Sequence, residues 1–424
     1  MRSEQSRFSR PILFAALFAV LTFLPSICMA ERYLVLHQFF GPEGIQPRSG
    51  LIVDPSGNLY GTTTYGGHLN CTTFSLPNGC GTVFKVALVG NRWTETVLYA
   101  FNKSDGAYPV GGLVFDTAGN LYGTTSSGGD LSCNAPNGCG SVFKLTPNSD
   151  GSWTRSTLHN FTSSPDGFGP GASLIFDVAG NLYGTTGSGG LNAGYGTIFK
   201  LSPNSNGSWT ETVLHSFTGA DGSLPVAGLI FDPSGNLYGT ASTGGQNGSG
   251  VVYKLAPNPD GSWTESVLHS FASSDGQDPF GGVVLDAAGN LYGTTMMGGP
   301  IHDCSGHCGV VYKLSQNSGG GWSETVLHAF GGGPASYPAA SLTFDASGNL
   351  YGTASGYAGP GAVFRMTPVA GGKWSFATVF AFPAQPAFQP DAPVVFDQAG
   401  NLYGTTAYCG GGSTCSGVVF KITP

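Results

Sequence analysis

Eight of the nine cysteines are arranged in short-range pairs, and their spacing points most directly to chemistry; the ninth, Cys28, lies in the first thirty residues. An even number of cysteines with local pairing is typical of disulfides in chains that leave the reducing cytosol. The spacing therefore predicts four disulfide bonds. The pairs are Cys71 and Cys80, Cys133 and Cys139, Cys304 and Cys308, and Cys409 and Cys415.

The third cysteine pair lies in a segment that offers a second kind of chemistry. His302 and His307 stand beside Cys304 and Cys308, and these residue types are tetrahedral zinc ligands. The spacing is not that of a standard zinc finger, and the other three pairs lack the histidines, which favours a disulfide. We predict no metal and no cofactor, with zinc in this segment as the alternative.

Histidines are the next candidates, because they serve in catalysis. Five of the eight occupy one position of a repeat, whereas a catalytic histidine is usually singular. No serine or cysteine nucleophile stands out beside them. We therefore assign them a structural role and predict no catalytic residue. The five are His37, His159, His215, His269 and His328.

Tyrosines and acids in loops are the candidate ligand-binding residues. Tyr65 and Tyr408 hold the same repeat position, and Tyr357 is displaced from it by one residue. Neighbouring aromatic rings at these positions suit stacking on sugar rings. An acid followed by glycine also recurs upstream of a proline, as a glycan or calcium contact or, in the alternative that we favour, as turn chemistry. These acids are Glu43, Asp105, Asp166, Asp221 and Asp275.

The elements that position these residues come from a tandem repeat. The string GNLYG occurs seven times, beginning at Gly57, Gly119, Gly180, Gly235, Gly289, Gly348 and Gly400. A period of this length is typical of propellers and solenoids. The unit over residues 228–271 contains four short strands joined by turns.

The turn before each GNLYG string has an explicit sequence. Asp232, Pro233 and Gly235 stand where a type I turn prefers them, and we expect Gly235 in the left-handed conformation. A ring of seven aspartates at this position suggests calcium ligands, but capping of each turn by its own side chain is the interpretation that we favour. The aspartates are Asp54, Asp116, Asp177, Asp232, Asp286, Asp345 and Asp397.

Strand patterns complete the unit. The first strands are almost wholly apolar, which predicts burial on both faces. The third strands carry a basic residue, and Lys200, eleven residues before Glu211 across a hairpin, is expected to pair with it. The basic positions are Lys85, Lys144, Lys200, Lys254, Lys313, Arg365 and Lys421.

The count of fourth strands decides the topology. The tryptophan-containing version occurs six times, and the missing seventh matches residues 33–39 at the N-terminus. A chain that starts with an orphan fourth strand and ends after a third strand closes a ring. We predict an all-β fold: a seven-bladed β-propeller of four-stranded antiparallel blades, closed by residues 31–40. The cysteine-bearing loops and the loops between blades then share one face.

The N-terminus predicts export. Residues 1–30 have a basic start and an apolar stretch too short to span a membrane, with expected cleavage near Ala30 and Glu31. Residues 31–424 form the propeller domain and carry a formal charge of −10, which disfavours nucleic-acid binding. We expect a secreted or periplasmic monomer with no membrane span.

The repeated motifs GLIFDxxGNLYGTT, GxVFKL and WTETVLHSF resemble those of the GloVer-type tandem-repeat proteins, also described as choice-of-anchor proteins of bacteria. The resemblance covers about residues 31–424. It implies secretion and a propeller-like repeat, with no assigned activity. The GxxxDxxGNLY core is also similar to NHL-type propeller repeats, which mostly bind partners.

These observations favour a non-catalytic binding or scaffold protein that recognises an extracellular glycan or protein on its loop face. The alternative is a secreted carbohydrate-active hydrolase or lyase, which requires two facing carboxylates. The residues that enter the inner strands offer little to a metal-dependent hydrolase. They are Gly50, Gly112, Ser173, Gly228, Gly282, Ser341 and Pro393.

Overall fold

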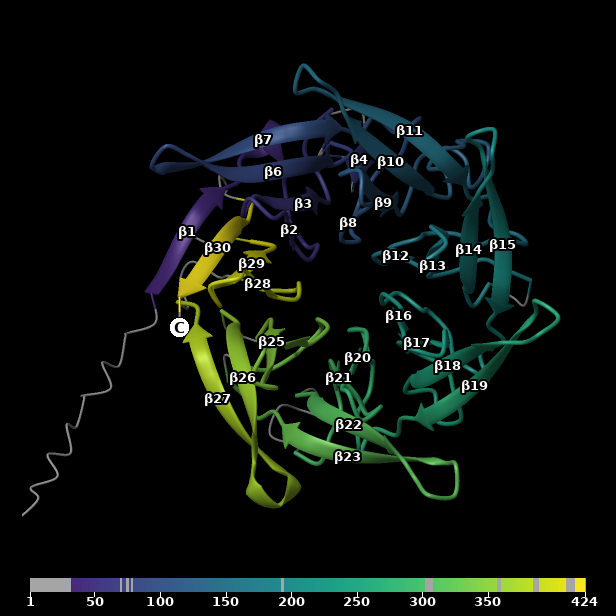
Figure 1. Cartoon of the computed structure of the whole chain (residues 1–424), viewed down its shortest axis with the longest axis vertical. Helices are drawn as coiled ribbons and strands as arrows, with labels where there is room; N and C mark the ends of the chain where they lie inside the picture. Colours follow the sequence, from purple (N-terminus) through teal and green to yellow (C-terminus); the bar gives the residue numbers. More distant parts are fainter. Residues whose placement is uncertain are drawn as a thin grey trace, which may run out of the picture. The chain divides into compact units, whose positions relative to one another are not determined.

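The computed structural model contains seven four-stranded antiparallel sheets arranged in a ring (Figure 1), which confirms the predicted propeller. All described residues belong to one compact unit, Glu31–Pro424. The structure describes residues 32–68, 71–73, 76–77, 79–191, 194–301, 308–333, 335–356, 360–383, 389–408 and 416–423.

Blades 1 to 6 use their four strands in chain order, from the inner first strand to the outer fourth strand, whereas the fourth strand of blade 7 comes from the N-terminus. Blade 1 contains β2 (Ile52–Val53), β3 (Leu59–Thr63), β6 (Thr82–Val89) and β7 (Arg92–Ala100). Blade 2 contains β8 (Val114–Phe115), β9 (Leu121–Thr125), β10 (Ser141–Pro147) and β11 (Trp153–Asn160). Blade 3 contains β12 (Ile175–Phe176), β13 (Leu182–Thr186), β14 (Thr197–Pro203) and β15 (Trp209–Ser216). Blade 4 contains β16 (Ile230–Phe231), β17 (Leu237–Ala241), β18 (Val251–Pro257) and β19 (Trp263–Ser270). Blade 5 contains β20 (Val284–Leu285), β21 (Leu291–Thr295), β22 (Val310–Gln316) and β23 (Trp322–Ala329). Blade 6 contains β24 (Thr343–Phe344), β25 (Leu350–Ala354), β26 (Ala362–Val369) and β27 (Lys373–Ala381). Blade 7 is β28 (Val395–Phe396), β29 (Leu402–Thr406), β30 (Val418–Thr423) and β1 (Arg32–Gln38); β4 (Thr72–Thr73), β5 (Leu76–Pro77) and the 3-10 turns η1 (Gly41–Glu43) and η2 (Ala370–Gly372) lie in loops.

The N-terminal strand closes the ring as predicted. β1 pairs antiparallel with β30 from Arg32 opposite Thr423 to Gln38 opposite Val418. The ring of Phe39, just after β1, lies 4.9 Å from the Phe84 ring of blade 1. On its other side, Tyr33 stacks on Phe380 of blade 6 at 4.5 Å. Both neighbours of blade 7 therefore contact the closing strand.

The Asp-containing turn is held by its own side chain, which confirms the capping interpretation. Asp232 Oδ1 accepts the backbone N–H groups of Ser234 and Asn236, and its Oδ2 accepts the Asn236 amide and the Tyr238 hydroxyl. Burial alone would raise the pKa of Asp232, but these hydrogen bonds lower it below its ordinary value. Gly235 has φ +82°, the predicted left-handed conformation. The Asn and Tyr of GNLYG are thus partners of the aspartate.

The second strand, not the first, is the fully buried strand of each blade. All five residues of β3 are buried, whereas the first strand β2 has two paired residues, both half-buried. The prediction of first strands buried on both faces therefore holds for Leu51, which is 5% exposed, but not for Ile52 and Val53, because these strands border the central channel. In β3, a Cβ added to Gly61 would lie 2.7 Å from the Phe84 ring, so only glycine lets that ring cross the strand.

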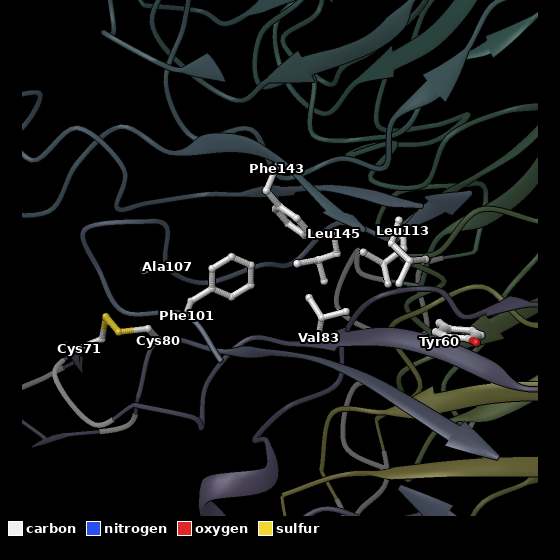
Figure 2. Packing of buried hydrophobic residues seen from close by; sticks show 10 residues of the cluster. Tyr60, Cys71, Cys80, Val83, Phe101, Ala107, Leu113, Phe143 and Leu145 are labelled. Atoms are coloured by element: carbon white, nitrogen blue, oxygen red, sulfur yellow. A yellow bond between two sulfur atoms is a disulfide. The ribbon is translucent and has the colours of Figure 1, made fainter. Parts of the chain in front are cut away.

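Aromatic side chains fill the junctions between blades. Phe101, at the end of blade 1, meets the Phe143 ring of blade 2 edge-on at 5.1 Å, within a core that also holds Val83 and Leu145 (Figure 2). Such aromatic pairs contribute about 0.5–1.5 kcal/mol beyond the area that they bury. The same contact recurs at every junction, as Phe39–Phe84, Phe101–Phe143, Phe161–Phe199, Phe217–Tyr253, Phe271–Tyr312, Phe330–Phe364 and Phe382–Phe420.

The basic residue of the third strand contacts a tyrosine, so the predicted Lys–Glu pairing was wrong. Lys200 lies opposite Tyr183 on one side and Thr212 on the other, and its Nζ is 5.7 Å from the Tyr183 ring centroid. Glu211 lies opposite Leu201. A one-residue difference in register moves a side chain to the other face of the sheet, which separates Glu211 from Lys200.

Candidate ligand-binding site

Two classes of loop meet on one face of the ring, as expected. In blade 1, Ile45 of the loop between blades forms an antiparallel bridge with Tyr65 of the loop between the second and third strands. Equivalent bridges join Ala107 to Ser127 and Ser223 to Thr243 in blades 2 and 4. The backbone of one loop class therefore holds the other in place, and a ligand on this face meets a stiff surface.

Disulfides reinforce this face in blades 1 and 2. Cys71 is bonded to Cys80 and Cys133 to Cys139, with Cα–Cα distances of 5.1 and 5.6 Å. These two confirm the predicted pairing. Cys308 is also disulfide-bonded. Cys304, Cys409 and Cys415 lie outside the described residues, as do both histidines of the zinc alternative.

The rim of the channel has an unusual backbone. Gln46, Tyr108 and Leu224, each just before a repeat proline, have φ between +54° and +57°, a region uncommon for residues other than glycine. The N–H of Tyr108 donates to the Cys80 carbonyl of the preceding blade, and its carbonyl accepts the N–H of Ser126 in its own blade. Hydrogen bonds to the preceding blade and within its own blade hold Tyr108 in this conformation.

A cavity of about 740 Å³ occupies the channel inside this rim, within the range of small-ligand pockets. Glycine, alanine, valine and serine from blades 1 to 6 form most of its wall, and blade 7 contributes Asp391 and Pro393. Phe280, which is 46% exposed, supplies an aromatic ring to the wall. Among the described lining residues, the charged ones are Arg48 and Asp391.

These two charged residues come from blades 1 and 7, which adjoin at the closure. Arg48 Nε lies 4.0 Å from Asp391 Oδ2. Burial raises the pKa of Asp391, and the Arg48 charge opposes that rise. A half-exposed cation beside a partly desolvated carboxylate gives this side of the cavity paired donors and acceptors.

Tyr408 completes the charged cluster. Its hydroxyl accepts hydrogen bonds from Gln46 Nε2 at 2.8 Å and Arg48 Nη2 at 3.3 Å, and the Arg48 guanidinium lies 5.9 Å from its ring centroid. The side chain stays 38% exposed. Tyr408, Gln46, Arg48 and Asp391 together form what we call the closure cluster.

The predicted tyrosines fall on both sides of one short segment. Tyr65 bridges Ile45 and packs edge-on against Tyr108 at 5.4 Å, and Tyr408 binds the adjacent Gln46. Tyr65 and Tyr408 thus flank residues 45–48, although no direct contact joins them in the described structure. Tyr357 lies outside the described residues.

The predicted acids have local partners. Asp105 accepts the Tyr99 hydroxyl at 2.6 Å and caps Asn102, and Asp166, 6% exposed, accepts Thr162 groups. Turn chemistry, the interpretation that we favoured, accounts for these contacts. In four cases the partner is also the fourth-strand histidine, as His37–Glu43, His159–Asp166, His215–Asp221 and His269–Asp275.

The histidine–acid pairs and the charged residues of the cavity were not predicted, although the sequence contains a signal for each. The histidine and its acid are separated by six or seven residues each time, which predicts a pair across one loop. The residue after each repeat proline is small or apolar in blades 2 to 6, as at Val110 and Val226, and charged only at Arg48 and Asp391. Alignment of the repeats would have exposed both residues as departures from the pattern.

Comparisons with known proteins agree with the repeat. A family model described as the Gloeobacter/Verrucomicrobia repeat matches residues 26–154, 69–306, 131–358 and 231–424. No curated protein matches this chain. Among the described residues, no helix has the length and apolar character of a membrane span.

Similar solved structures are distant. A chain from the nidogen/laminin complex shares 16% identity, with 68% of this chain and 86% of that chain covered and a TM-score of 0.39. A protein of unknown function from Dyadobacter fermentans shares 13% identity, with 82% and 98% covered and a TM-score of 0.42. At these values the similarity carries no functional argument.

Proposed function

We propose that this chain, which belongs to the Gloeobacter/Verrucomicrobia repeat family, is a secreted binding protein that recognises an extracellular glycan at the channel mouth. The closure cluster carries the proposal. Two of its members, Arg48 and Asp391, lie in a cavity whose wall is otherwise small and mostly apolar, and Tyr408 and Gln46 lie beside Arg48. Ligand sites combine such a wall with a few convergent polar groups.

A glycan fits the chemistry of this cavity. Sugar hydroxyls both donate and accept hydrogen bonds, and the Arg48–Asp391 pair supplies a donor beside an acceptor. Sugar rings also present C–H faces that pack on aromatic rings. Phe280 is partly exposed in the cavity wall, and Tyr408 is partly exposed beside Arg48. A glycan chain end is narrow enough to enter a channel, whereas a folded protein surface is not.

The chemistry of the cysteines supports the location in the proposal. The disulfides of blades 1 and 2 are compatible with an extracellular or periplasmic protein. Residues 1–30 act in this proposal as a signal peptide cleaved near Ala30, leaving residues 31–424 as the propeller domain.

A glycan array with repeat-guided variants tests the proposal. Arg48→Val and Asp391→Val each install the residue that blades 2 and 4 carry at the same repeat position, so the fold should persist. We expect each to weaken glycan binding at least tenfold, because the ligand loses a charged hydrogen-bonding partner. Tyr408→Ala should reduce binding by a similar factor, and Tyr65→Ala by less.

Val226→Ala is the matched control, because it changes the same repeat position in blade 4, away from the closure. Binding should change less than threefold in that variant. A blank array with folded wild-type protein would exclude glycan recognition. Glycan binding that survives Arg48→Val and Asp391→Val unchanged would move the site elsewhere on the ring.

A further inference from the structure

A second set of polar side chains lies in the outer part of the ring, where fourth strands of adjacent blades face each other. At four junctions a histidine, the acid of the following loop and a glutamate of the next blade occur together. The sets are His37, Glu43 and Glu95; His159, Asp166 and Glu211; His215, Asp221 and Glu265; and His269, Asp275 and Glu324.

Two of these sets bring three ligating atoms close together. In the junction of blades 3 and 4, His215 Nε2 lies 3.0 Å from Asp221 Oδ2, and one Glu265 carboxylate oxygen completes a group whose atoms are all within 4.8 Å of one another. His37, Glu43 and Glu95 form the equivalent group at the closure. Within the part of the chain that the structure describes, these are the two such groups.

The glutamates of these groups have unmet hydrogen-bonding capacity. Glu265 Oε1 and Glu95 Oε1 are buried and have no hydrogen-bond partner among the described residues, and the same is true of His37 Nε2. A buried carboxylate without a partner is costly. A bound cation would remove this cost.

The junction of blades 1 and 2 provides an internal comparison. Its repeat positions hold Tyr99 for the histidine, Asp105 for the acid and Arg155 for the glutamate. The Arg155 guanidinium donates to the Asp105 carbonyl oxygen, and the Arg155 and Asp105 charges attract each other. Here the chain supplies its own cation at the place where the other junctions present a carboxylate.

The remaining junctions use aromatic contacts instead. His328 stacks on Phe376 at 4.0 Å, and Phe380 stacks on Tyr33 at 4.5 Å. Phe376 and Tyr33 occupy the repeat position of the glutamate. The repeat position of the glutamate therefore holds an aromatic residue at two junctions, an arginine at one and a glutamate at four. Only the glutamate, beside a histidine and a second acid, calls for a cation that the chain itself does not supply.

We propose that the groups His215–Asp221–Glu265 and His37–Glu43–Glu95 each bind one divalent zinc-like metal ion between adjacent blades. One imidazole nitrogen with two carboxylate oxygens is a mixed ligand set suited to Zn²⁺, whereas Ca²⁺ prefers oxygen ligands alone. Ligands of a tetrahedral zinc ion lie about 3.3 Å apart. The 3.0 Å His215–Asp221 and 3.6 Å His37–Glu43 separations are close to this value, and the glutamate oxygen of each group lies within 4.8 Å of the other two ligand atoms.

A metal at these positions would clamp one blade to the next. His215 and Asp221 belong to blade 3 and its exit loop, and Glu265 to blade 4. At the closure, the ion would tie His37 on β1 to Glu95 on β7 of blade 1, beside the contact of Phe39 with Phe84. The metal sites are separate from the channel mouth, so this inference does not depend on the proposed function.

Equilibrium dialysis against Zn²⁺, with metal analysis of the full-length oxidised protein, tests the inference. We expect two bound equivalents at pH 7.5, no competition from Ca²⁺, and an increase in Tm of about 3 °C for each site saturated a hundredfold above its Kd. Glu265→Gln and Glu95→Gln should each lose one equivalent, and the double variant both. Glu211→Gln is the matched control and should keep two.

Each variant must melt cooperatively without metal for its stoichiometry to count. A zinc anomalous signal in wild-type crystals gives a second readout that needs no variant, and density at His215 is expected. Absence of bound zinc in the wild type, zinc bound only by the cysteine-containing loops, or unchanged stoichiometry in Glu265→Gln and Glu95→Gln would each overturn the proposal.

Discussion

The turn networks and the channel mouth follow opposite rules within the same repeat. The aspartate of the turn binds its own Asn in all seven blades, and the Tyr hydroxyl joins it in six. At the mouth, the residue after the repeat proline is charged only in blades 1 and 7. The uniform positions stabilise a turn within each blade, whereas the charged residues at the mouth occur only in the two blades that adjoin at the closure.

Blade junctions fall between these extremes. The phenylalanine contact is present at every junction, and the histidine, acid and glutamate set is present at four. Variants can therefore compare the turn networks, the blade junctions and the channel mouth, because the equivalent residues in other repeats show which side chains each position accepts.

Deletion of residues 31–40 should have the largest effect. It removes β1 from β30 and takes away the buried Leu36 and Phe39 side chains, each worth about 2–5 kcal/mol. We expect loss of cooperative thermal unfolding in calorimetry. A synthetic peptide of residues 31–40 should restore part of the transition, and a truncated protein that melts like the intact one would contradict the role of the closing strand.

Asp232→Ala should be next, since it leaves the Asn236 and Tyr238 donors without their acceptor. We expect a loss of about 2–4 kcal/mol in the free energy of unfolding, measured with urea. Asp260→Ala is the control, because Asp260 caps only the solvent-exposed turn between β18 and β19 through Ser262. Equal losses in the two variants would show that the network adds nothing to turn capping.

Glu211→Gln should change the pH dependence of stability. Burial raises the pKa of Glu211 to about 7 in the folded state from 4.5, so between these values only the unfolded chain ionises and the folded state loses stability as the pH rises. The full shift corresponds to about 3 kcal/mol, which partial exposure reduces to about 1–2 kcal/mol.

The variant should therefore match the wild type at pH 4 and exceed its stability at pH 8. Urea titrations in the presence of a chelator measure both values without interference from metal. Parallel pH profiles of the two proteins would show that Glu211 ionises normally in the fold.

Tyr253→Phe should stabilise the protein by about 0.5–1.5 kcal/mol. The buried hydroxyl of Tyr253 has no hydrogen-bond partner among the described residues, and five other blades carry phenylalanine at this position. Tyr238→Phe is the matched control with the opposite expected sign, because its hydroxyl donates to Asp232. Destabilisation by Tyr253→Phe would mean that its hydroxyl has a partner such as a buried water.

Arg48→Val should have the smallest effect on stability, within about 0.5 kcal/mol, because Arg48 is a half-exposed residue whose repeat equivalents in blades 2 to 6 are small or apolar. Thermal unfolding measures this directly. A decrease of several kcal/mol in stability would mean that Arg48 stabilises the ring. The channel mouth would then not differ from the turn networks in its contribution to stability.

Much of the fold followed from residues that lie close together in the chain. The turn chemistry of Asp232 and Gly235, the number of blades, the closing strand at residues 33–39 and the shared loop face were all predicted. Each depends on a local pattern or on a count. The two described disulfides belong to the same class, because their cysteines are 9 and 6 residues apart.

Register and burial were harder to predict. Lys200 and Glu211 were expected to pair, and the hairpin places Thr212 opposite Lys200 instead. The hairpin turn sets this register, in which Pro203 lies opposite Trp209, and the extra residue Leu214 shifts the pairing only beyond Phe199. Strand composition gives hydrophobicity without saying which strand borders the channel, so the half-buried first strands were not foreseen.

The sequence by itself determined the repeated unit, because the turns, strand lengths and junction aromatics of one blade are encoded within about 55 residues that recur seven times. Only the tertiary structure decided the candidate sites. Arg48 meets Asp391, and His215 meets Glu265, when the ring brings neighbouring blades together. Contacts between residues of different blades depend on how the blades pack around the closed ring, and the sequence of a single repeat does not encode that packing.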